Sequence, residues 1–249
     1  MTNPSSPQSL IGGIGLTEVH VYNQRPAPDG LCSGCPHVHA VTDEGYYVLS
    51  GHGWVEFHDL NHGFRKLTLA PGDYAHFPPL VMHRLVSAEN LVILGIMGNG
   101  GLAERGEARI YFGPEVEASP ERFAELMSLP RARGLEGALD RRDAAVTAYQ
   151  SLLILWDQDR PAYFAELERF FTCHCAAIAA KAGEMHLAVD QGPRAWAHTT
   201  GERLKALPQM SKPGGDVFFH KHGSEEALGM CGVLRPMLRL DRLAGAART

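Results

Sequence analysis

A period-two alternation of apolar and polar residues runs through the first part of the chain and is typical of half-buried β-strands. In GLTEVHVYN, which begins at residue 15, Val19 and Val21 alternate with His20 and Tyr22. Turn sequences such as LNHG and APGD interrupt this pattern at short intervals. Short strands with frequent turns and no helix between them predict an antiparallel β-barrel or sandwich. The strands after the first are expected near residues 36–42, 44–50, 53–58, 64–70, 73–78, 82–88, 90–97 and 108–113.

A helical pattern replaces this alternation after Gly113 and Pro114. Ser119 followed by Pro120 predicts a helix start, because serine favours the N-cap position and proline the first helical position. Asp159 is expected to cap a later helix. Helices are predicted from residue 120, over 140–159, over 159–183 and over 193–206. The chain is therefore expected to divide into three parts, namely a tail at 1–12, a barrel at 13–115 and a mainly helical region at 116–249.

Composition and charge narrow the class of protein. The chain has 249 residues, of which 45% are hydrophobic, and a formal charge of −5. No long run of Lys and Arg occurs, so a nucleic acid is not an expected partner. No apolar run approaches the roughly 18 residues that span a bilayer, so no membrane association is expected. Five cysteines without a recognisable signal peptide fit reduced thiols and a cytoplasmic location.

Three histidines and a glutamate are candidate metal ligands. His37 and His39 are two residues apart on a predicted strand, so their side chains point to the same face. Glu44 begins the next strand, and His83 comes from far along the chain, as expected when strands close around a centre. Three imidazoles and one carboxylate suit Fe, Mn, Ni, Co, Cu or Zn better than Ca or Mg. We therefore expect one divalent transition metal ion inside the barrel.

The spacing of these residues resembles the cupin superfamily. Four residues match the first cupin motif, namely His37, His39, Glu44 and Gly51. The glycine that begins this motif is displaced by one position here. The second motif is matched by Gly72, Pro78 and His83. A glycine and an asparagine of the second motif are replaced here by Leu80 and Ser87. The resemblance covers roughly residues 13–113 and implies an antiparallel double-stranded β-helix, or jelly roll, around a metal held by the four candidate ligands.

Two further residues are candidates for catalysis. If Glu44 points inward, strand parity places Tyr46 inward and Tyr47 outward. The Tyr46 hydroxyl is then able to hydrogen-bond a substrate or a developing oxyanion, although a packed aromatic ring is an equal alternative. His76 is a candidate base in the pocket, but it alternates with Phe77, which has the better claim to the interior.

The cupin resemblance implies several kinds of activity, and the motifs do not choose among them. We expect a metal-dependent enzyme that acts on a small oxygenated organic substrate. Dioxygenase chemistry is slightly favoured, because four protein ligands leave neighbouring positions for substrate and O₂. The alternatives are a metal-dependent sugar isomerase, epimerase or lyase, and a non-catalytic sensor that binds a sugar or other small molecule. The resemblance also implies a homodimer, formed through outward-facing Tyr47 and Leu49 and the apolar helix 149–156.

The cysteine motifs have weaker claims to function. Cys32 and Cys35 form a CxxC sequence, but a zinc site needs two more ligands nearby. Cys173, His174 and Cys175 are adjacent on a predicted helix, where neighbouring side chains diverge by about 100° and cannot easily grip one ion.

The remaining histidines are not interpreted as metal ligands. The segment FFHKHGSEE repeats the HxH spacing followed by a glutamate, but too few residues follow it to build a second barrel. At most, this segment adds a polar wall to a pocket. Its candidate residues are His220, His222 and Glu226. Four others are interpreted as solvated or singly hydrogen-bonded, namely His58, His62, His186 and His198.

Overall fold

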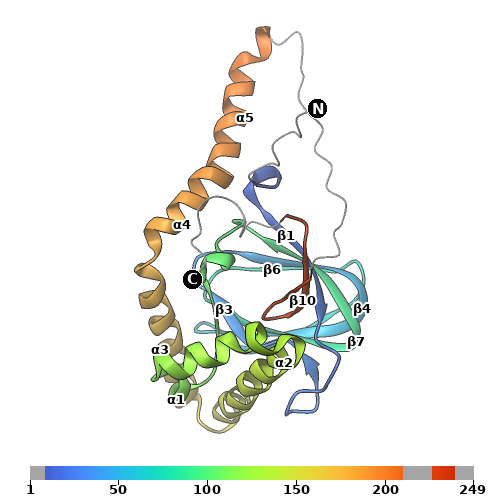
Figure 1. Ribbon diagram of the computed structural model, residues 1–249, viewed down its shortest axis with the longest axis vertical. Helices are drawn as coiled ribbons and strands as arrows, with labels where there is room; N and C mark the ends of the chain where they lie inside the picture. Colours follow the sequence, from blue (N-terminus) through green and yellow to red (C-terminus); the bar gives the residue numbers. More distant parts are fainter. Residues whose placement is uncertain (1–8, 210–225, 239–249) are drawn as a thin grey trace.

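A computed structural model describes residues 9–209 and 226–238 of the chain. It shows a curled antiparallel sheet with helices packed across one side of it, and a helical arm that extends beyond the sheet (Figure 1). The predicted tail spans residues 1–12, of which residues 1–8 lie outside the described residues. A short 3-10 helix, Ile11–Gly13, precedes the first strand.

The sheet contains ten strands. They are β1 (Gly15–Val21), β2 (Cys32–Ser33), β3 (His37–His39), β4 (Glu44–Asp59), β5 (Gly63–Leu69), β6 (Tyr74–Phe77), β7 (Met82–Met97), β8 (Ala108–Ile110), β9 (Ala227–Leu228) and β10 (Gly232–Pro236). The main path of paired strands runs β5-β4-β7-β1-β10-β9, while β2 and β3 pair with β7, β6 with β4 and β8 with β3. Because this path ends at β5 and β9, the described strands form a curled sheet with two edges instead of a closed barrel.

The curvature of the sheet is located in its long strands, β4 and β7. Each unites two strands that the sequence predicts separately, and their pairing has register shifts between Val48 and Gly53. Gly51 lies in this bulge with a φ of 74°, and a side chain there would meet the carbonyl oxygen of Glu89 at 2.2 Å. The bulge bends β4 so that its first half pairs with β6 and its second half with β5.

The last strand of the sheet comes from the region predicted to be mainly helical. β10 pairs antiparallel with β1, with Val19 opposite Leu234. β9 and β10 form a C-terminal hairpin, which we define as residues 227–236. The sequence gives no clear strand signal here, because Gly and Pro interrupt it. The prediction of a mainly helical region is therefore confirmed for residues 116–209, whereas this hairpin within the region is formed of strands.

The helices follow β8 along the chain. They are α1 (Pro114–Glu117), α2 (Pro120–Gln158), α3 (Arg160–Ala179), α4 (Ala182–Val189) and α5 (Ala195–Ala206). A 3-10 helix (Ala103–Arg105) precedes β8, a π-helical segment (Asp190–Arg194) joins α4 to α5, and a 3-10 helix (Leu207–Gln209) follows α5. The predicted caps form, since Ser119 accepts a hydrogen bond from the Arg122 N–H and Asp159 from the Ala162 N–H. Within the described residues, no helix is both long and apolar enough to cross a membrane.

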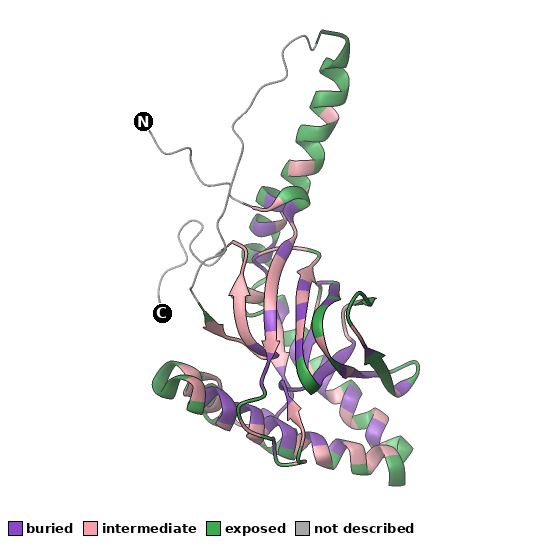
Figure 2. Ribbon diagram, turned by 90° about the vertical axis from the view of Figure 1, so that its right-hand side faces the viewer, coloured by how far each residue is buried: buried purple, intermediate pink, exposed green. Residues whose placement is uncertain are grey.

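Two apolar clusters hold the sheet and helices together. One fills the interior of the curled sheet and includes Val48, Phe77 and Ile93. The other joins the outside of the sheet to α2 and α3 through residues such as Met82 and Tyr149. Figure 2 shows these buried positions on the sheet and the packed helices, whereas α5 has no buried residue. The site described next therefore lies in a scaffold that helices support from outside.

Candidate metal centre

The four predicted metal ligands meet inside the curled sheet. β3 supplies His37 and His39, β4 begins with Glu44, and β7 supplies His83 directly opposite His37. All four side chains are buried, and their candidate donor atoms lie within 4.8 Å of one another. The turn before His83 forms although leucine replaces the family's glycine, because Leu80 itself adopts a left-handed φ of 59°. The expected constellation is therefore present.

Each imidazole is oriented by a hydrogen bond at its Nδ1 atom. Nδ1 of His37 lies 2.9 Å from the carbonyl oxygen of Cys35, and Nδ1 of His83 lies 3.0 Å from that of Val81. Both partners can only accept, so Nδ1 carries the proton and the Nε2 lone pair points into the centre. His39 is held the same way by the carboxylate of Glu107, at 2.7 Å.

Glu107 is a candidate functional residue that the sequence motifs do not indicate. Its side chain is fully buried, and one oxygen accepts hydrogen bonds from the Val41 and Thr42 N–H groups while the other accepts from His39. A carboxylate behind a metal-binding imidazole fixes its tautomer and makes it a better ligand. Nothing near Glu107 in the sequence signals this role, since its partner is 68 residues away.

The donor atoms are spaced as ligands of one ion. His37 Nε2 and His83 Nε2 lie 3.0 Å apart, and Glu44 Oε2 lies 3.0 Å from His83 Nε2 and 3.3 Å from His39 Nε2. Donors at about 2.1 Å from a shared ion are about 3.0 Å apart when they subtend a right angle. Inward lone pairs and a carboxylate oxygen repel one another unless a proton or a metal ion lies between them. The residues therefore fit a divalent transition metal ion.

The pKa values of these groups reflect the same crowding. Burial, together with the neighbouring imidazoles of His83 and His39, holds the pKa of His37 well below its usual range. Burial opposes the charge on His39, but the carboxylates of Glu107 and Glu44 outweigh it and raise the pKa of His39 to about 10. Burial alone would raise the pKa of Glu44, yet His83 and His39 hold it well below its usual range. A metal ion would therefore replace a proton that the two carboxylates otherwise retain.

Two further side chains border the centre. Tyr46 points inward as strand parity predicts, is fully buried, and has its ring centroid 6.2 Å from that of His83. Within the described residues its hydroxyl makes no hydrogen bond. Cys231, from the turn of the C-terminal hairpin, places its sulfur 3.5 Å from His37 Nε2. The sequence analysis missed Cys231, because only the fold brings it beside His37.

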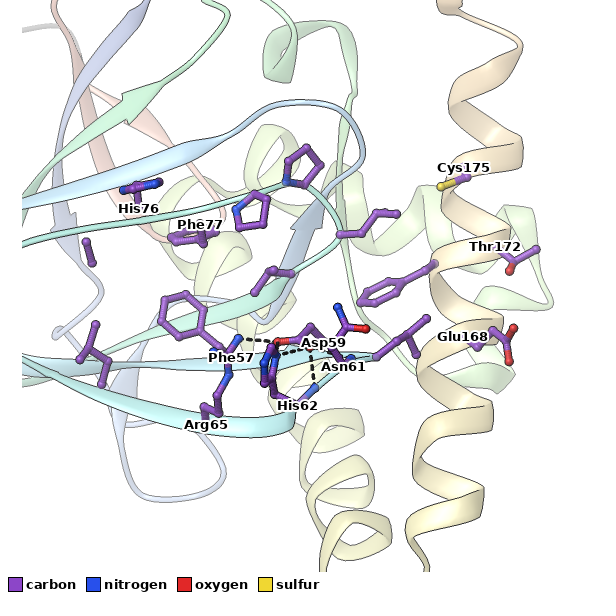
Figure 3. A pocket seen from close by; sticks show the side chains of 18 of the residues that line it. Phe57, Asp59, Asn61, His62, Arg65, His76, Phe77, Glu168, Thr172 and Cys175 are labelled. Atoms are coloured by element: carbon purple, nitrogen blue, oxygen red, sulfur yellow. Dashed lines mark hydrogen bonds and ion pairs between the residues drawn. The ribbon is translucent and has the colours of Figure 1, made fainter.

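The predicted position of His76 needs correction. His76 is exposed and lies on the outer side of β6, whereas its neighbour Phe77 is buried with its ring centroid 4.5 Å from that of His83. His76 instead lines a groove of about 1340 Å³ between the sheet and α3, facing Thr172 and Cys175 across it (Figure 3). Alternation along β6 causes this placement, since only one of two successive side chains faces the interior.

The other cysteine motifs do not form metal sites among the residues that the structure describes, where one cluster of candidate ligands is found. All five cysteines are free thiols. His174, between Cys173 and Cys175, is buried and bonds through Nε2 to the Glu107 carbonyl oxygen at 2.7 Å. His174 thus anchors Glu107, the residue before β8, to α3.

The interpretation of His58 as solvated or singly hydrogen-bonded is wrong. His58 is fully buried and has two hydrogen bonds, one between Nδ1 and the Tyr163 hydroxyl at 2.8 Å and one between Nε2 and the Tyr149 hydroxyl at 2.6 Å. Helices α2 and α3 supply these partners, which the sequence alone does not place. His220 and His222 lie outside the described residues, and Glu226 forms an ion pair with Arg235.

Comparison with known protein families gives one match. Residues 26–97 match the sequence model of a family described as "Cupin domain". This segment contains all four candidate ligands and Tyr46. A search of curated proteins found no significant match to the chain.

Solved structures give partial likenesses. A cupin protein from Bacteroides fragilis is 21% identical, with 36% of this chain and 68% of that chain covered and a TM-score of 0.28. A TDP-fucose-3,4-ketoisomerase from Campylobacter jejuni is 8% identical, with coverage of 38% and 64% and a TM-score of 0.31. Oxalate decarboxylase from B. subtilis is 15% identical, with coverage of 47% and 29% and a TM-score of 0.34. The chain thus spans about two thirds of the first two structures and under a third of the last, and such low scores carry no argument about activity.

Proposed function

We propose, from the premise that this chain belongs to the cupin superfamily through its cupin domain at residues 26–97, that it is a metal-dependent enzyme acting on a small oxygenated organic substrate. His37, His39, Glu44 and His83 hold one divalent ion of Fe, Mn, Ni, Co, Cu or Zn. The observation that carries the proposal is the convergence of these four buried donors, with each imidazole oriented from behind by a hydrogen bond at Nδ1.

The protein's own groups set what the centre does. When bound, the metal ion supplies Lewis acidity and, if redox-active, a means of activating dioxygen. The Tyr46 hydroxyl, which has no hydrogen bond among the described residues, would donate one to a substrate oxygen as negative charge develops there. Phe57 and Phe77, whose ring centroids are 5.0 Å apart, keep bulk water from the ligands. Exclusion of water strengthens each of these electrostatic interactions.

Dioxygenase chemistry is the version we favour. The buried apolar residues inside the sheet include Val48, Phe57, Phe77 and Ile93. Such a lining suits dioxygen and a compact substrate that chelates through oxygen. A sugar would leave several hydroxyl groups without hydrogen-bond partners in this interior, at a cost of about 1–3 kcal/mol for each.

An isomerase or lyase is the second candidate, and one observation favours it. The Tyr46 hydroxyl has no hydrogen bond among the described residues and lies beside the Glu44 carboxylate. Burial is the largest cause that raises the pKa of Tyr46 well above its usual value, and the charge of Glu44 is the next. A tyrosine that keeps its proton in this position is suited to donate it to a substrate oxygen polarised by the metal. Oxygen dependence separates this reading from the first.

Metal analysis by mass spectrometry tests the centre itself. Protein isolated without added metal is expected to hold about one transition metal ion per chain, and His39→Ala should lose most of it. His52→Ala is the matched control, because its side chain is 58% exposed and lies outside the centre. Equal metal content in the parent and His39→Ala would contradict the proposal.

Oxygen uptake identifies the reaction class. An oxygenase consumes dioxygen in proportion to a substrate drawn from a panel of diketones, keto acids and sugars, and His39→Ala abolishes this uptake. Conversion without oxygen uptake supports the isomerase or lyase. Ligand binding without any conversion across the panel supports the sensor instead.

A further inference from the structure

The groove between the sheet and α3 is separated from the candidate metal centre by one layer of side chains. Phe57 and Phe77 line the groove, and the ring centroid of Phe77 is 4.5 Å from that of His83. Phe57 lies opposite His83 in the register of β4 and β7, and its ring centroid is 5.0 Å from that of Phe77. The groove therefore ends one side chain away from a candidate ligand.

The turn between β6 and β7 borders both the groove and the centre. Leu80 and Val81 line the groove. The Val81 carbonyl oxygen accepts the hydrogen bond from Nδ1 of His83 at 3.0 Å, and the Leu80 N–H donates to the carbonyl oxygen of His39 at 2.9 Å. A molecule in the groove would thus rest on the backbone that holds two of the ligands in place.

The surface of the groove nearest the centre is apolar. We define the groove floor as Phe57, Phe77 and Val81, which belong to the interior cluster and yet line the groove. Figure 3 shows Phe57 and Phe77 on the sheet side of the groove and α3 on the other side. The ring of Phe171 lines it from α3. Apolar ligand atoms in the groove would be in contact with carbon on two sides.

The charged groups that line the groove are not arranged to select a charged ligand. The Asp59 carboxylate accepts two backbone N–H groups at 2.8 Å and pairs with Arg65. The Nζ atom of Lys66 lies 3.6 Å from the ring centroid of Trp54, and Glu168 is exposed to solvent on α3. Positive and negative side chains are balanced, so the apolar floor decides what binds.

We infer that the substrate carries an apolar tail, which lies in this groove while its oxygen-bearing head passes between Phe57 and Phe77 to the ion. This inference rests on the proposed function. The groove has a volume of about 1340 Å³, so it has room for more than a compact head. Burial of the tail would make the enzyme prefer tailed molecules over short ones with the same head.

Alkyl hydroxamates are the probes that test this, because two oxygens of their head chelate a metal ion. The full-length protein is loaded with Co²⁺, and binding is followed by the change in its visible absorption. From acetohydroxamate to octanohydroxamate, each added methylene should tighten binding by about two- to fourfold, the upper value being that of a fully buried methylene. A compact interior site without the groove would instead reject the longer members of the series.

Two neighbouring alanines on α3 provide matched variants. Ala176 is exposed and lines the groove, whereas Ala177 is also exposed but lies outside the groove lining. Ala176→Trp, which fills part of the groove, should weaken octanohydroxamate binding by about tenfold or more and leave acetohydroxamate binding unchanged. Ala176→Asp, which puts a charge beside the tail, should act in the same direction. Ala177→Trp should bind both probes like the parent protein.

The outcomes separate this inference from the proposed function. If the parent protein binds no Co²⁺, the metal centre is wrong and the inference falls with it. If Co²⁺ and acetohydroxamate bind but tail length has no effect, or if both Ala176 variants keep the full effect, the centre stands and the groove inference is overturned. A change of molecular mass in Ala176→Trp, without any dependence on tail length, would assign the groove to a second copy of the chain instead.

Discussion

Glu107 is a buried residue that lies behind the candidate metal centre and orients one of its ligands. Its two oxygens accept three hydrogen bonds, from His39, Val41 and Thr42. A glutamine has an amide NH₂ group in place of one carboxylate oxygen. Either His39 or the N–H groups of Val41 and Thr42 would then face a donor instead of an acceptor. We therefore expect Glu107→Gln to lower metal affinity by about 10–100-fold.

Competition with a chelating dye measures this effect. Glu125→Gln is the control, because Glu125 is exposed on α2 and remote from the centre. Unchanged affinity in Glu107→Gln would show that the orientation of His39 does not depend on this carboxylate.

The Tyr46 hydroxyl can be tested by removing only that group. Tyr46→Phe should keep the fold and the metal content, because the ring still packs against Phe77 at a centroid distance of 5.3 Å. Turnover of the true substrate should fall by about 10²–10³-fold, the usual loss for one donor to a developing oxyanion. Steady-state kinetics gives the answer, and turnover at the parent rate would leave Tyr46 with a packing role alone.

Strand parity determines which residues of the site can be predicted from the sequence. His37, His39, Glu44 and Tyr46 were placed correctly because residues two apart on a strand share a face. Glu107 and Cys231 could not be placed, since each meets its histidine only in the folded chain, 68 and 194 residues away in sequence. The wrong interpretation of His58 has the same origin, because its tyrosine partners come from distant helices.

At the scale of elements, a polar network joins the sheet to the helices. The Tyr149 hydroxyl donates to Glu56, so its oxygen can accept from the Nε2–H of His58. The Tyr163 hydroxyl then donates to Nδ1, which leaves His58 neutral with both ring nitrogens satisfied. Burial lowers the pKa of His58 to about 3 in the folded protein.

This network predicts acid sensitivity. Unfolded histidine titrates at a pKa of about 6.5, so between that value and about 3 the unfolded state binds a proton that folded His58 does not. The contribution of neutral His58 to the free energy of unfolding is therefore fully present above about pH 6.5. It is lost progressively as the pH drops. Urea unfolding at several pH values should show a slope smaller by about one proton in His58→Gln. Equal slopes in both proteins would refute this account.

The elements themselves were predictable where local signals agree. Alternation and turn residues located β1 and β4 to β7, and the caps Ser119 and Asp159 located two helix starts. The joining of predicted strands into β4 and β7 was missed, because a bulge at Gly51 continues the strand instead of ending it. The C-terminal hairpin was missed because its pairing with β1 is a tertiary effect.

At the scale of the whole molecule, the sheet and the helices α2 and α3 depend on each other. A fragment that ends at residue 115 would lose β10 and expose the cluster around Met82. We expect this fragment to be unfolded or aggregated, and the full chain to unfold in one cooperative transition. Circular dichroism of both samples checks this, and a stable β spectrum from the fragment would show an independent domain.

The homodimer stays a prediction. Tyr47 and Leu49 are about two-fifths exposed on the outer face, and Ile154 is about half exposed on α2. Light scattering at micromolar concentration should give twice the mass of one chain. The mass of a single chain would contradict it, and Tyr47→Asp offers a control that should shift a dimer towards monomer.

The pairing of β1 with β10 has a consequence for biosynthesis. β1 can pair with β7 once residue 97 has left the ribosome, but its other edge waits until residue 236 has been made. At about 5–20 residues per second, this wait lasts on the order of ten seconds. An unpaired strand edge is a template for strands of other chains. The nascent polypeptide is therefore far more prone to aggregate than the finished one, and chaperones that shield this edge would decide how much of it matures.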